Sequence, residues 1–135
     1  MSDLPHITES EWLIMRQLWE EAPLTAAEIV KRVQMQKGLV DTTIKTLLRR
    51  LIAKKAVRFT IDEKNSKLYY YTPTVTEEEC ISEKSKHFLS IYYRDNLEKM
   101  VSAFVDDSDL TATEIDNLKK LLDEKKKELH NESGT

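Results

Sequence analysis

Threonines, lysines and arginines are concentrated in one short stretch of the sequence, DTTIKTLLRRLIAKK at positions 41–55. Hydroxyl and cationic side chains of this kind hydrogen bond to nucleic-acid bases and phosphates. An arginine can donate two hydrogen bonds to guanine O6 and N7, a threonine offers a hydroxyl and a methyl group, and a lysine neutralises a phosphate. The stretch therefore has the chemistry of a nucleic-acid contact, provided that these side chains share one face of a helix.

Apolar residues at helical spacing predict that the stretch is a helix with one buried face. Ile44 is followed by apolar residues at i+3, i+4, i+7 and i+8. When that face points inward, Ala53 and the polar residues point outward. We predict that the side chains facing the bases are Thr42, Thr43, Lys45, Thr46, Arg49 and Arg50. A basic outer face is usually only a solvated surface, so the charge of the rest of the chain must be weighed with it.

The charge of the chain is divided between its two halves. The 135 residues carry a formal net charge of -3, yet residues 1–75 hold 12 Lys+Arg against 9 Asp+Glu and the remainder holds 9 against 15. Between Lys31 and Lys67 the count is 11 basic residues against 3 acidic ones. This concentrated positive segment is typical of a phosphate-binding surface. We predict that the phosphate contacts are Lys31, Lys54, Lys55, Lys64 and Lys67.

Capping signals predict the elements that hold this helix in place. Four threonines are each followed three residues later by a glutamate, ahead of an apolar-periodic run, which is the pattern of a capping box at a helix start. The first helix should end before Pro23, and the second should end at Gly38, which suits a left-handed C-terminal position. The four pairs are Thr8/Glu11, Thr25/Glu28, Thr76/Glu79 and Thr111/Glu114.

After Lys55 the apolar pattern changes to a period of two. VRFTID and KLYYYT, separated by EKNS, predict a hairpin with a polar tip. Three helices followed by a hairpin is the order of a winged helix-turn-helix, which places its recognition helix in the major groove of DNA. The predicted fold class is mainly α with a small β-hairpin: a winged helix-turn-helix DNA-binding domain at residues 1–75, plus a C-terminal helical dimerisation region.

Residues 76–130 predict two further helices, broken near VDDSDLTAT. Two such helices cannot bury their apolar stripes alone, whereas two copies of the chain can, so we predict a homodimer with residues 76–130 as the dimerisation domain. Residues 131–135 should be a frayed tail. The predicted dimerisation residues are Phe88, Tyr92, Leu97, Met100, Val101, Phe104, Ile115, Leu118 and Leu122.

Four segments resemble a known family. Their order and spacing are similar to those of the bacterial penicillinase and methicillin-resistance repressors, which are grouped with copper-transport repressors as the BlaI/MecI/CopY family. The segments are EWLIMRQLW, TAAEIVKRV, TTIKTLLRRLIAKKAV and YYYTPTVTEEE. The similarity runs from Thr8 to Leu129. It implies a homodimeric transcriptional repressor of a resistance-type operon, which binds an inverted TACA/TGTA-type repeat in double-stranded DNA.

The resemblance also implies roles for single residues. The residues that match the family's recognition-helix contacts are Thr43, Lys45, Thr46 and Arg50. Arg49 falls where relatives often carry a smaller residue, so its assignment rests on helix geometry. The family's serine cap corresponds to Val40, which is a poor cap, and we expect Asp41 to take over and shift the helix start by one residue.

The branches of the family differ in how repression ends. The copper branch carries a cysteine-rich C-x-C motif near its end, and this sequence reads KKKELHNESGT there, so copper release is not expected. The β-lactam branch is released when a membrane sensor-protease system leads to cleavage of an Asn-Phe bond in the dimerisation region. The corresponding bond here is Ala103-Phe104, with alanine in place of asparagine. We take it as the candidate cleavage site.

Other classes of function stay open as alternatives. One is a winged-helix regulator that copper or another small ligand releases, and another is a protein-interaction module that uses the tyrosines at 69–71 and has no specific DNA target. Catalysis, cofactors and metals are not expected, because His6, His87 and His130 are scattered and Cys80 is the single cysteine, expected to be a buried, inert thiol.

The location expected from the sequence is the cytoplasm. No apolar run approaches the roughly 18 residues of a membrane span. The segment MSDLPHITESEW lacks the basic-then-apolar pattern of a secretory signal.

Overall fold

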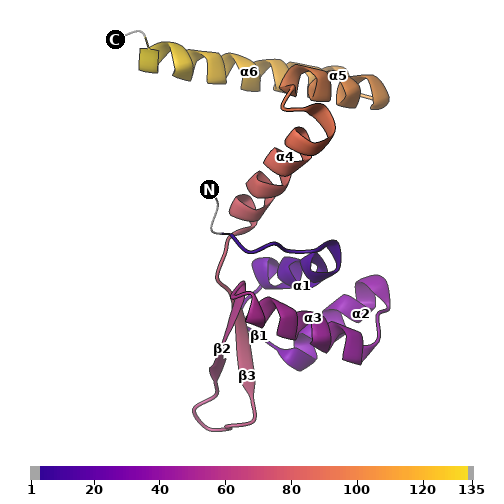
Figure 1. Ribbon diagram of the computed structural model, residues 1–135, viewed down its shortest axis with the longest axis vertical. Helices are drawn as coiled ribbons and strands as arrows, with labels where there is room; N and C mark the ends of the chain where they lie inside the picture. The colour runs from indigo at the N-terminus through magenta and orange to yellow at the C-terminus, as the bar shows by residue number, and fades with distance from the viewer. Residues whose placement is uncertain (1–3, 134–135) are drawn as a thin grey trace. The chain divides into compact units, whose positions relative to one another are not determined.

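The computed structural model describes residues 4–133 (Figure 1), and these divide after His87 into two compact units. The sequence suggested a domain boundary after Val75, just before helix α4 (Glu77–Tyr93), whereas the division lies within α4. The first part of α4 belongs to the first unit because Cys80 is buried in that unit's core. No helix in the described range is both long and apolar enough to cross a membrane.

Three helices form the first part of the first unit, and their ends follow the signals in the sequence. Each predicted capping box is present at the start of α1 and α2: a threonine Oγ1 accepts from the N–H of the glutamate three residues on, and that glutamate accepts from the threonine N–H. α2 ends at Gly38, whose φ of 65° is the left-handed conformation expected there. The helices are α1 (Glu9–Glu20), α2 (Ala26–Lys37) and α3 (Asp41–Ala53).

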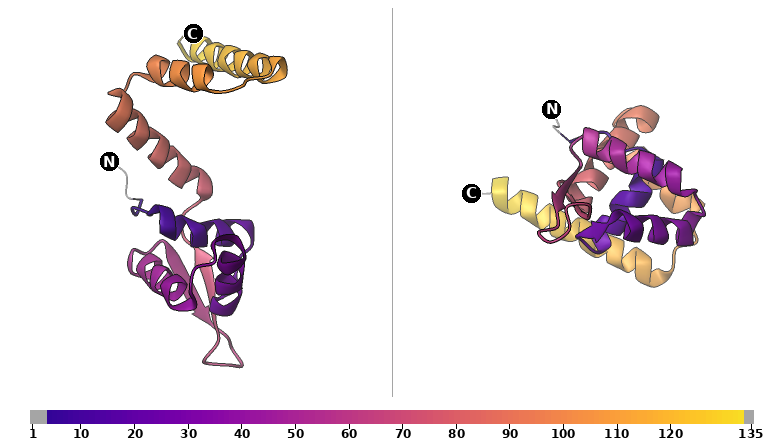
Figure 2. Two further views of the ribbon diagram at one scale, coloured as in Figure 1. Left: turned by 90° about the vertical axis from the view of Figure 1, so that its right-hand side faces the viewer. Right: turned by 90° about the horizontal axis from the view of Figure 1, so that it is seen from below.

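A three-stranded antiparallel sheet of order β1-β3-β2 completes the winged helix. The predicted hairpin is present as β2 (Val57–Ile61) and β3 (Tyr69–Pro73). β1 (Leu24–Thr25) pairs with the other edge of β3; it was not predicted, because two residues show no periodicity. Figures 1 and 2 show the hairpin extending beyond the three helices, as a wing does.

One hydrophobic core joins the helices, β1 and the base of the hairpin. The predicted inner face of α3 is in it, with Ile52 half-buried at its edge, and the thiol of Cys80 is buried as expected. Burial of this set from water is the main source of stability available to a domain of this size. The buried apolar residues are Ile7, Ile14, Met15, Leu18, Leu24, Ile29, Val33, Ile44, Leu47, Leu48, Leu51, Ala56, Val57 and Cys80.

Both tryptophans lie on α1 at the edge of this core. The ring centroids of Trp12 and Trp19 are 5.1 Å apart in an edge-to-face arrangement. The indole Nε1 of Trp19 donates a hydrogen bond of 2.9 Å to the carbonyl oxygen of Val75. The segment that enters α4 is thereby tied to the first unit.

The second unit contains the end of α4, then α5 (Leu97–Asp107) and α6 (Ala112–Ser133). The sequence predicted two helices after Val75, and this was wrong. The chain leaves the helical conformation at Arg94 and Asp95, which both have positive φ, and Asn96 caps a new helix by accepting from the N–H of Lys99.

The two remaining capping boxes are confirmed. One forms at Thr76/Glu79, before α4 in the first unit, and the other at Thr111/Glu114, before α6 in the second. α6 continues to Ser133, so residues 131–133 are helical rather than frayed, and residues 134–135 of the predicted tail lie outside the described residues.

Candidate nucleic-acid interface

The outward face of α3 carries the predicted base-facing residues, and all six side chains are exposed. The buried residues Ile44, Leu48 and Leu51 fix this orientation, since turning the helix would bring apolar side chains into water. The hydroxyl of Thr46 donates to the carbonyl oxygen of Thr42 at 2.9 Å, so that its oxygen lone pairs face outward as acceptors. The face can accept and donate hydrogen bonds over its whole length.

The first turn of α3 differs from the prediction. The N-cap is Val40, which makes no side-chain cap hydrogen bond, and Asp41 is the first helical residue rather than a new cap. The carboxylate of Asp41 instead forms an ion pair of 3.1 Å with Lys45, one turn along. Because no side chain within residues 4–133 caps this helix start, its first N–H groups are left to solvent or to an incoming anion.

The tip of the wing is ordered by two short polar side chains. Oδ2 of Asp62 accepts from the backbone N–H groups of Lys64 and Asn65, each at 3.0 Å, and Oδ1 of Asn65 accepts from the N–H of Lys67 at 3.0 Å. These bonds shape the turn and leave the side chains of Lys64 and Lys67 exposed at its end. Sequence reasoning named the two lysines and missed the residues that position them, although Asp and Asn are frequent in such turns.

Aromatic residues stiffen the strands of the wing. Phe59 and Tyr69 stack with ring centroids 5.0 Å apart and planes 4° from parallel, and Tyr71 contacts the same phenylalanine ring at 6.3 Å. Burial, together with the nearby Tyr69, raises the pKa of the Tyr71 hydroxyl. The tyrosines therefore act first as cross-strand packing partners in the wing.

The predicted phosphate contacts fall into two groups. Lys31, Lys55, Lys64 and Lys67 are exposed, whereas Lys54 is half-buried and paired within the protein. Arg58 on β2 is a further exposed cation on the wing that the prediction did not include. Because Arg58 lies in a strand, three residues after Lys55, no helical spacing related it to the basic face of α3.

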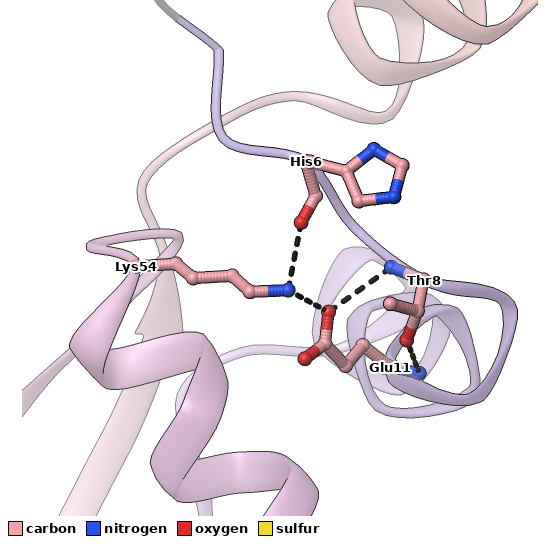
Figure 3. A network of polar contacts seen from close by, with 4 residues as sticks. All are labelled: His6, Thr8, Glu11 and Lys54. Atoms are coloured by element: carbon pink, nitrogen blue, oxygen red, sulfur yellow. Dashed lines mark hydrogen bonds and ion pairs between the residues drawn. The ribbon is translucent and has the colours of Figure 1, made fainter.

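Lys54 forms an ion pair at the end of α3 (Figure 3). Its ammonium nitrogen lies 2.5 Å from Oε1 of Glu11 and 2.8 Å from the carbonyl oxygen of His6. Glu11 is 1% exposed, and its Oε1 also accepts from the N–H of Thr8 at 3.0 Å. Burial by itself would raise the pKa of the Glu11 carboxyl, but the hydrogen bonds from Lys54 and Thr8 outweigh it and lower that pKa.

The second unit carries the predicted dimerisation residues on open surfaces. All of them are exposed except Met100, which is half-buried. Phe88 contacts Tyr92 and Phe104 through ring centroids 5.1 Å and 6.0 Å apart, so these three aromatic residues form one cluster. Ala103 and Phe104, the candidate cleavage site, lie inside α5, where Phe104 is 51% exposed.

No metal centre is formed by the described residues, in which no three His, Cys, Asp or Glu side chains come together. Burial raises the pKa of the Cys80 thiol, with a further contribution from Glu79. A thiol in this condition is a poor nucleophile.

The sequence profile of the penicillinase repressor family matches residues 7–124. A penicillinase repressor of Bacillus licheniformis is 31% identical over 126 residues, which is 93% of this chain and 96% of that protein. The methicillin resistance regulatory protein MecI of Staphylococcus aureus strain N315 is 32% identical over 119 residues, 88% of this chain and 94% of that protein.

One solved structure is informative about the first unit. The monomeric form of Bacillus licheniformis BlaI, solved in solution in complex with the blaP half-operator, matches with a TM-score of 0.50 and 26% identity. The match covers 58% of this chain and 93% of that one.

Proposed function

Because the chain belongs to the penicillinase repressor family, we propose that it is a cytoplasmic, homodimeric transcriptional repressor that binds operator DNA. Its target is an inverted repeat of the TACA/TGTA type, and each copy of the first unit takes one half-site. BlaI, a relative with this fold, is known in complex with a half-operator. Repression follows because a protein bound to the operator occupies the DNA needed for transcription.

The observation that carries this proposal is the outward face of α3. This face exposes hydroxyl and cationic side chains, while the opposite side of the helix is buried in the core. The exposed residues are Thr43, Lys45, Thr46 and Arg50. A helix presented in this way fits the major groove, where arginine reads guanine and threonine contacts thymine or a phosphate. Arg49 and Thr42 extend the same face. Lys64 and Lys67 at the wing tip, together with Lys31 and Lys55, supply phosphate contacts that fix the register.

Dimerisation follows from the apolar surface of the second unit. Each copy binds its half-site weakly, and linking two copies makes the second binding event intramolecular, which raises the overall affinity. The aromatic cluster of Phe88, Tyr92 and Phe104 and the apolar stripe of α6 supply the contact between copies. Contiguous exposed apolar surfaces of this kind are typical of protein–protein contact sites.

Release from the operator follows from cleavage between Ala103 and Phe104 by a protease that a membrane sensor activates. Proteases bind extended peptide, so α5 must open locally before the bond is cut. No side chain of α5 is buried within one chain, which makes this opening inexpensive once the dimer contact loosens. Cleavage would then divide the aromatic cluster, with Phe88 and Tyr92 on one fragment and Phe104 and α6 on the other. Each copy of the first unit would be left on its half-site with weak binding.

The test is a fluorescence-anisotropy titration of the full-length protein at two salt concentrations. One duplex carries the inverted TACA/TGTA repeat and the other a scrambled sequence of the same composition. We expect at least about a hundredfold preference for the repeat, a threshold below the roughly thousandfold or greater preference that is typical of specific over non-specific DNA binding. We also expect a complex containing two chains, seen by sedimentation.

Two outcomes would contradict the proposal. Equal, salt-sensitive binding to both duplexes would leave a non-specific DNA-binding protein. No binding to either duplex at low salt would favour a protein-interaction module instead.

A further inference from the structure

α3 is held at its C-terminal end and left open at its N-terminal end. At the C-terminal end the N–H of Ala56 donates to the carbonyl oxygen of Leu51 at 2.9 Å. The hydroxyl of Thr74 donates to the carbonyl oxygen of Lys55 at 2.6 Å. At the N-terminal end no side chain of the described residues caps the helix. The buried face of α3 decides which side chains point outward, and these contacts at its C-terminal end, next to Lys54, add a second constraint on the direction of that outer face.

The carboxylate oxygen that Lys54 contacts already has a structural task. Oε1 of Glu11 closes the capping box of α1 by accepting from the N–H of Thr8, and the ammonium of Lys54 lies against the same oxygen (Figure 3). The third partner is the carbonyl oxygen of His6, in the segment that leads into α1. One ammonium group thus joins the start of α1, the preceding segment and the end of α3.

The charge balance keeps Lys54 in this position. Glu11 is buried, and Lys54 is its only cationic partner within the described residues. If the ammonium swung out to a phosphate, the carboxylate of Glu11 would be left buried without its counter-ion, which is far more costly than the gain of one exposed ion pair. The neighbouring Lys55 has no such commitment, because its side chain is exposed and forms no ion pair with the residues described.

We propose that Lys54 is a positioning residue, which sets the orientation of the DNA-reading face of α3 through Glu11 and His6, and that it does not contact phosphate. This replaces the expectation from the sequence, which grouped Lys54 with the phosphate-binding lysines. The proposal rests on the proposed function of α3. It separates two adjacent lysines of identical chemistry into two different roles.

The experiment compares Lys54→Met with the matched control Lys55→Met, in the full-length dimer, at a temperature where thermal melts show each variant folded. Binding to the operator duplex and to the scrambled duplex is measured over a series of salt concentrations. Loss of a phosphate contact lowers the steepness of log affinity against log salt concentration by about 0.9 per site, and it lowers the affinity for both duplexes alike. Lys55→Met should behave in this way.

Lys54→Met should give the opposite pattern. The salt slope should stay at the wild-type value, whereas operator affinity falls about tenfold, the scale expected when a base contact is lost because the reading face is displaced. Affinity for the scrambled duplex should change little, because only the reading face has moved. Lys54→Arg, which keeps a cation beside Glu11, should restore most of the operator preference.

Glu11→Gln decides the matter if Lys54→Met does not fold. A positioning role predicts that this variant also loses operator preference. Where Lys54→Met folds, the double variant should lose no more operator preference than Lys54→Met alone. A phosphate-binding role predicts stronger DNA binding and an unchanged or steeper salt slope, since Lys54 is set free. That result, or a slope for Lys54→Met reduced as in Lys55→Met, would overturn the proposal. Failure of the wild type to prefer the operator would instead overturn the function of α3, before any variant is compared.

Discussion

The two compact units of the chain place their apolar side chains in opposite ways. In the first unit, residues such as Ile14, Ile44 and Leu51 are 0% exposed. In the second, no side chain described between Phe88 and Glu132 is buried, and Tyr92 and Leu122 are 70% and 66% exposed. The first unit is thus a domain with its own core, whereas the second consists of amphipathic helices that form no buried core among the described residues of one chain.

Together with the proposed dimer, this difference predicts that the two units obtain their stability from different sources. A domain with an internal core unfolds at a temperature that does not depend on protein concentration, while a surface that is buried only between copies becomes more stable as concentration rises. Any substitution can therefore be assigned to one source or the other by repeating its measurement at several concentrations.

The largest expected effect is on the second unit. Phe104→Asp places a charge in the aromatic cluster of both copies, and we expect the dimer to weaken by about a thousandfold, or roughly 4 kcal/mol. Sedimentation velocity measures the change. Ser102→Asp, an exposed residue of the same helix outside the apolar stripe, is the control and should leave the dimer intact. A dimer equally stable in both variants would show that the cluster is not the contact between copies.

A somewhat smaller effect is expected in the core of the first unit. Leu51→Ala leaves a cavity beneath the recognition helix and should cost about 3 kcal/mol of stability, at every protein concentration. Thermal or urea unfolding provides the measurement. In the second unit, Leu121→Ala removes an exposed side chain. It should change the free energy of unfolding of the dissociated chain by less than about 0.5 kcal/mol. A concentration-dependent loss in Leu51→Ala would contradict the division between the units.

The capping boxes allow the same comparison on a smaller scale. Thr25→Ala removes the cap of α2 and should cost about 1 kcal/mol regardless of concentration. Thr111→Ala removes the corresponding bonds at the start of α6, and its cost should appear in the stability of the dimer. Urea unfolding at low and high concentration distinguishes the two, and identical behaviour would count against separate sources of stability.

The smallest effects are expected on acidification. Hydrogen bonds from the N–H and hydroxyl of Thr25 hold the pKa of Glu28 below its ordinary value of 4.5, and Thr111 does the same for Glu114. Because these pKa values are lowered by folding, the stabilisation is fully present above the ordinary pKa and is lost as the pH falls through the lowered one.

Glutamine variants test this pH dependence. Glu28→Gln and Glu114→Gln should each lose less stability than the wild type when the pH falls from neutral to below 4.5. Urea midpoints at both pH values give the comparison. A variant that loses as much as the wild type would exclude its carboxylate as a source of the acid sensitivity.

Much of the first unit was predictable from the sequence because its signals are local. A threonine and a glutamate three residues apart define a capping box by themselves, and all four boxes form. The outward face of α3 was also predictable, since the apolar spacing of Ile44 and its partners fixes the direction of every other side chain on the helix.

Features that depend on distant residues were not predictable. β1 exists because β3 lies beside it. The turn at Arg94–Asn96 was missed for a different reason: Asn96 caps α5 through the N–H of Lys99, without the Thr/Glu pair that marks four other helix starts. Lys54 is the clearest case in the candidate site. Its neighbours in sequence are those of a phosphate-binding lysine, whereas its partner Glu11 lies 43 positions away in the chain.

The two tryptophans on α1 provide an intrinsic fluorescence probe of the first unit. Trp12 and Trp19 are its only tryptophans, and both lie in the first unit, whereas the aromatic residues of the second unit are phenylalanines and tyrosines. Selective excitation of indole therefore follows the DNA-reading unit alone, without any added dye. Since the Trp19 indole is hydrogen bonded to Val75, its emission should also register any loosening of the segment that leads into α4.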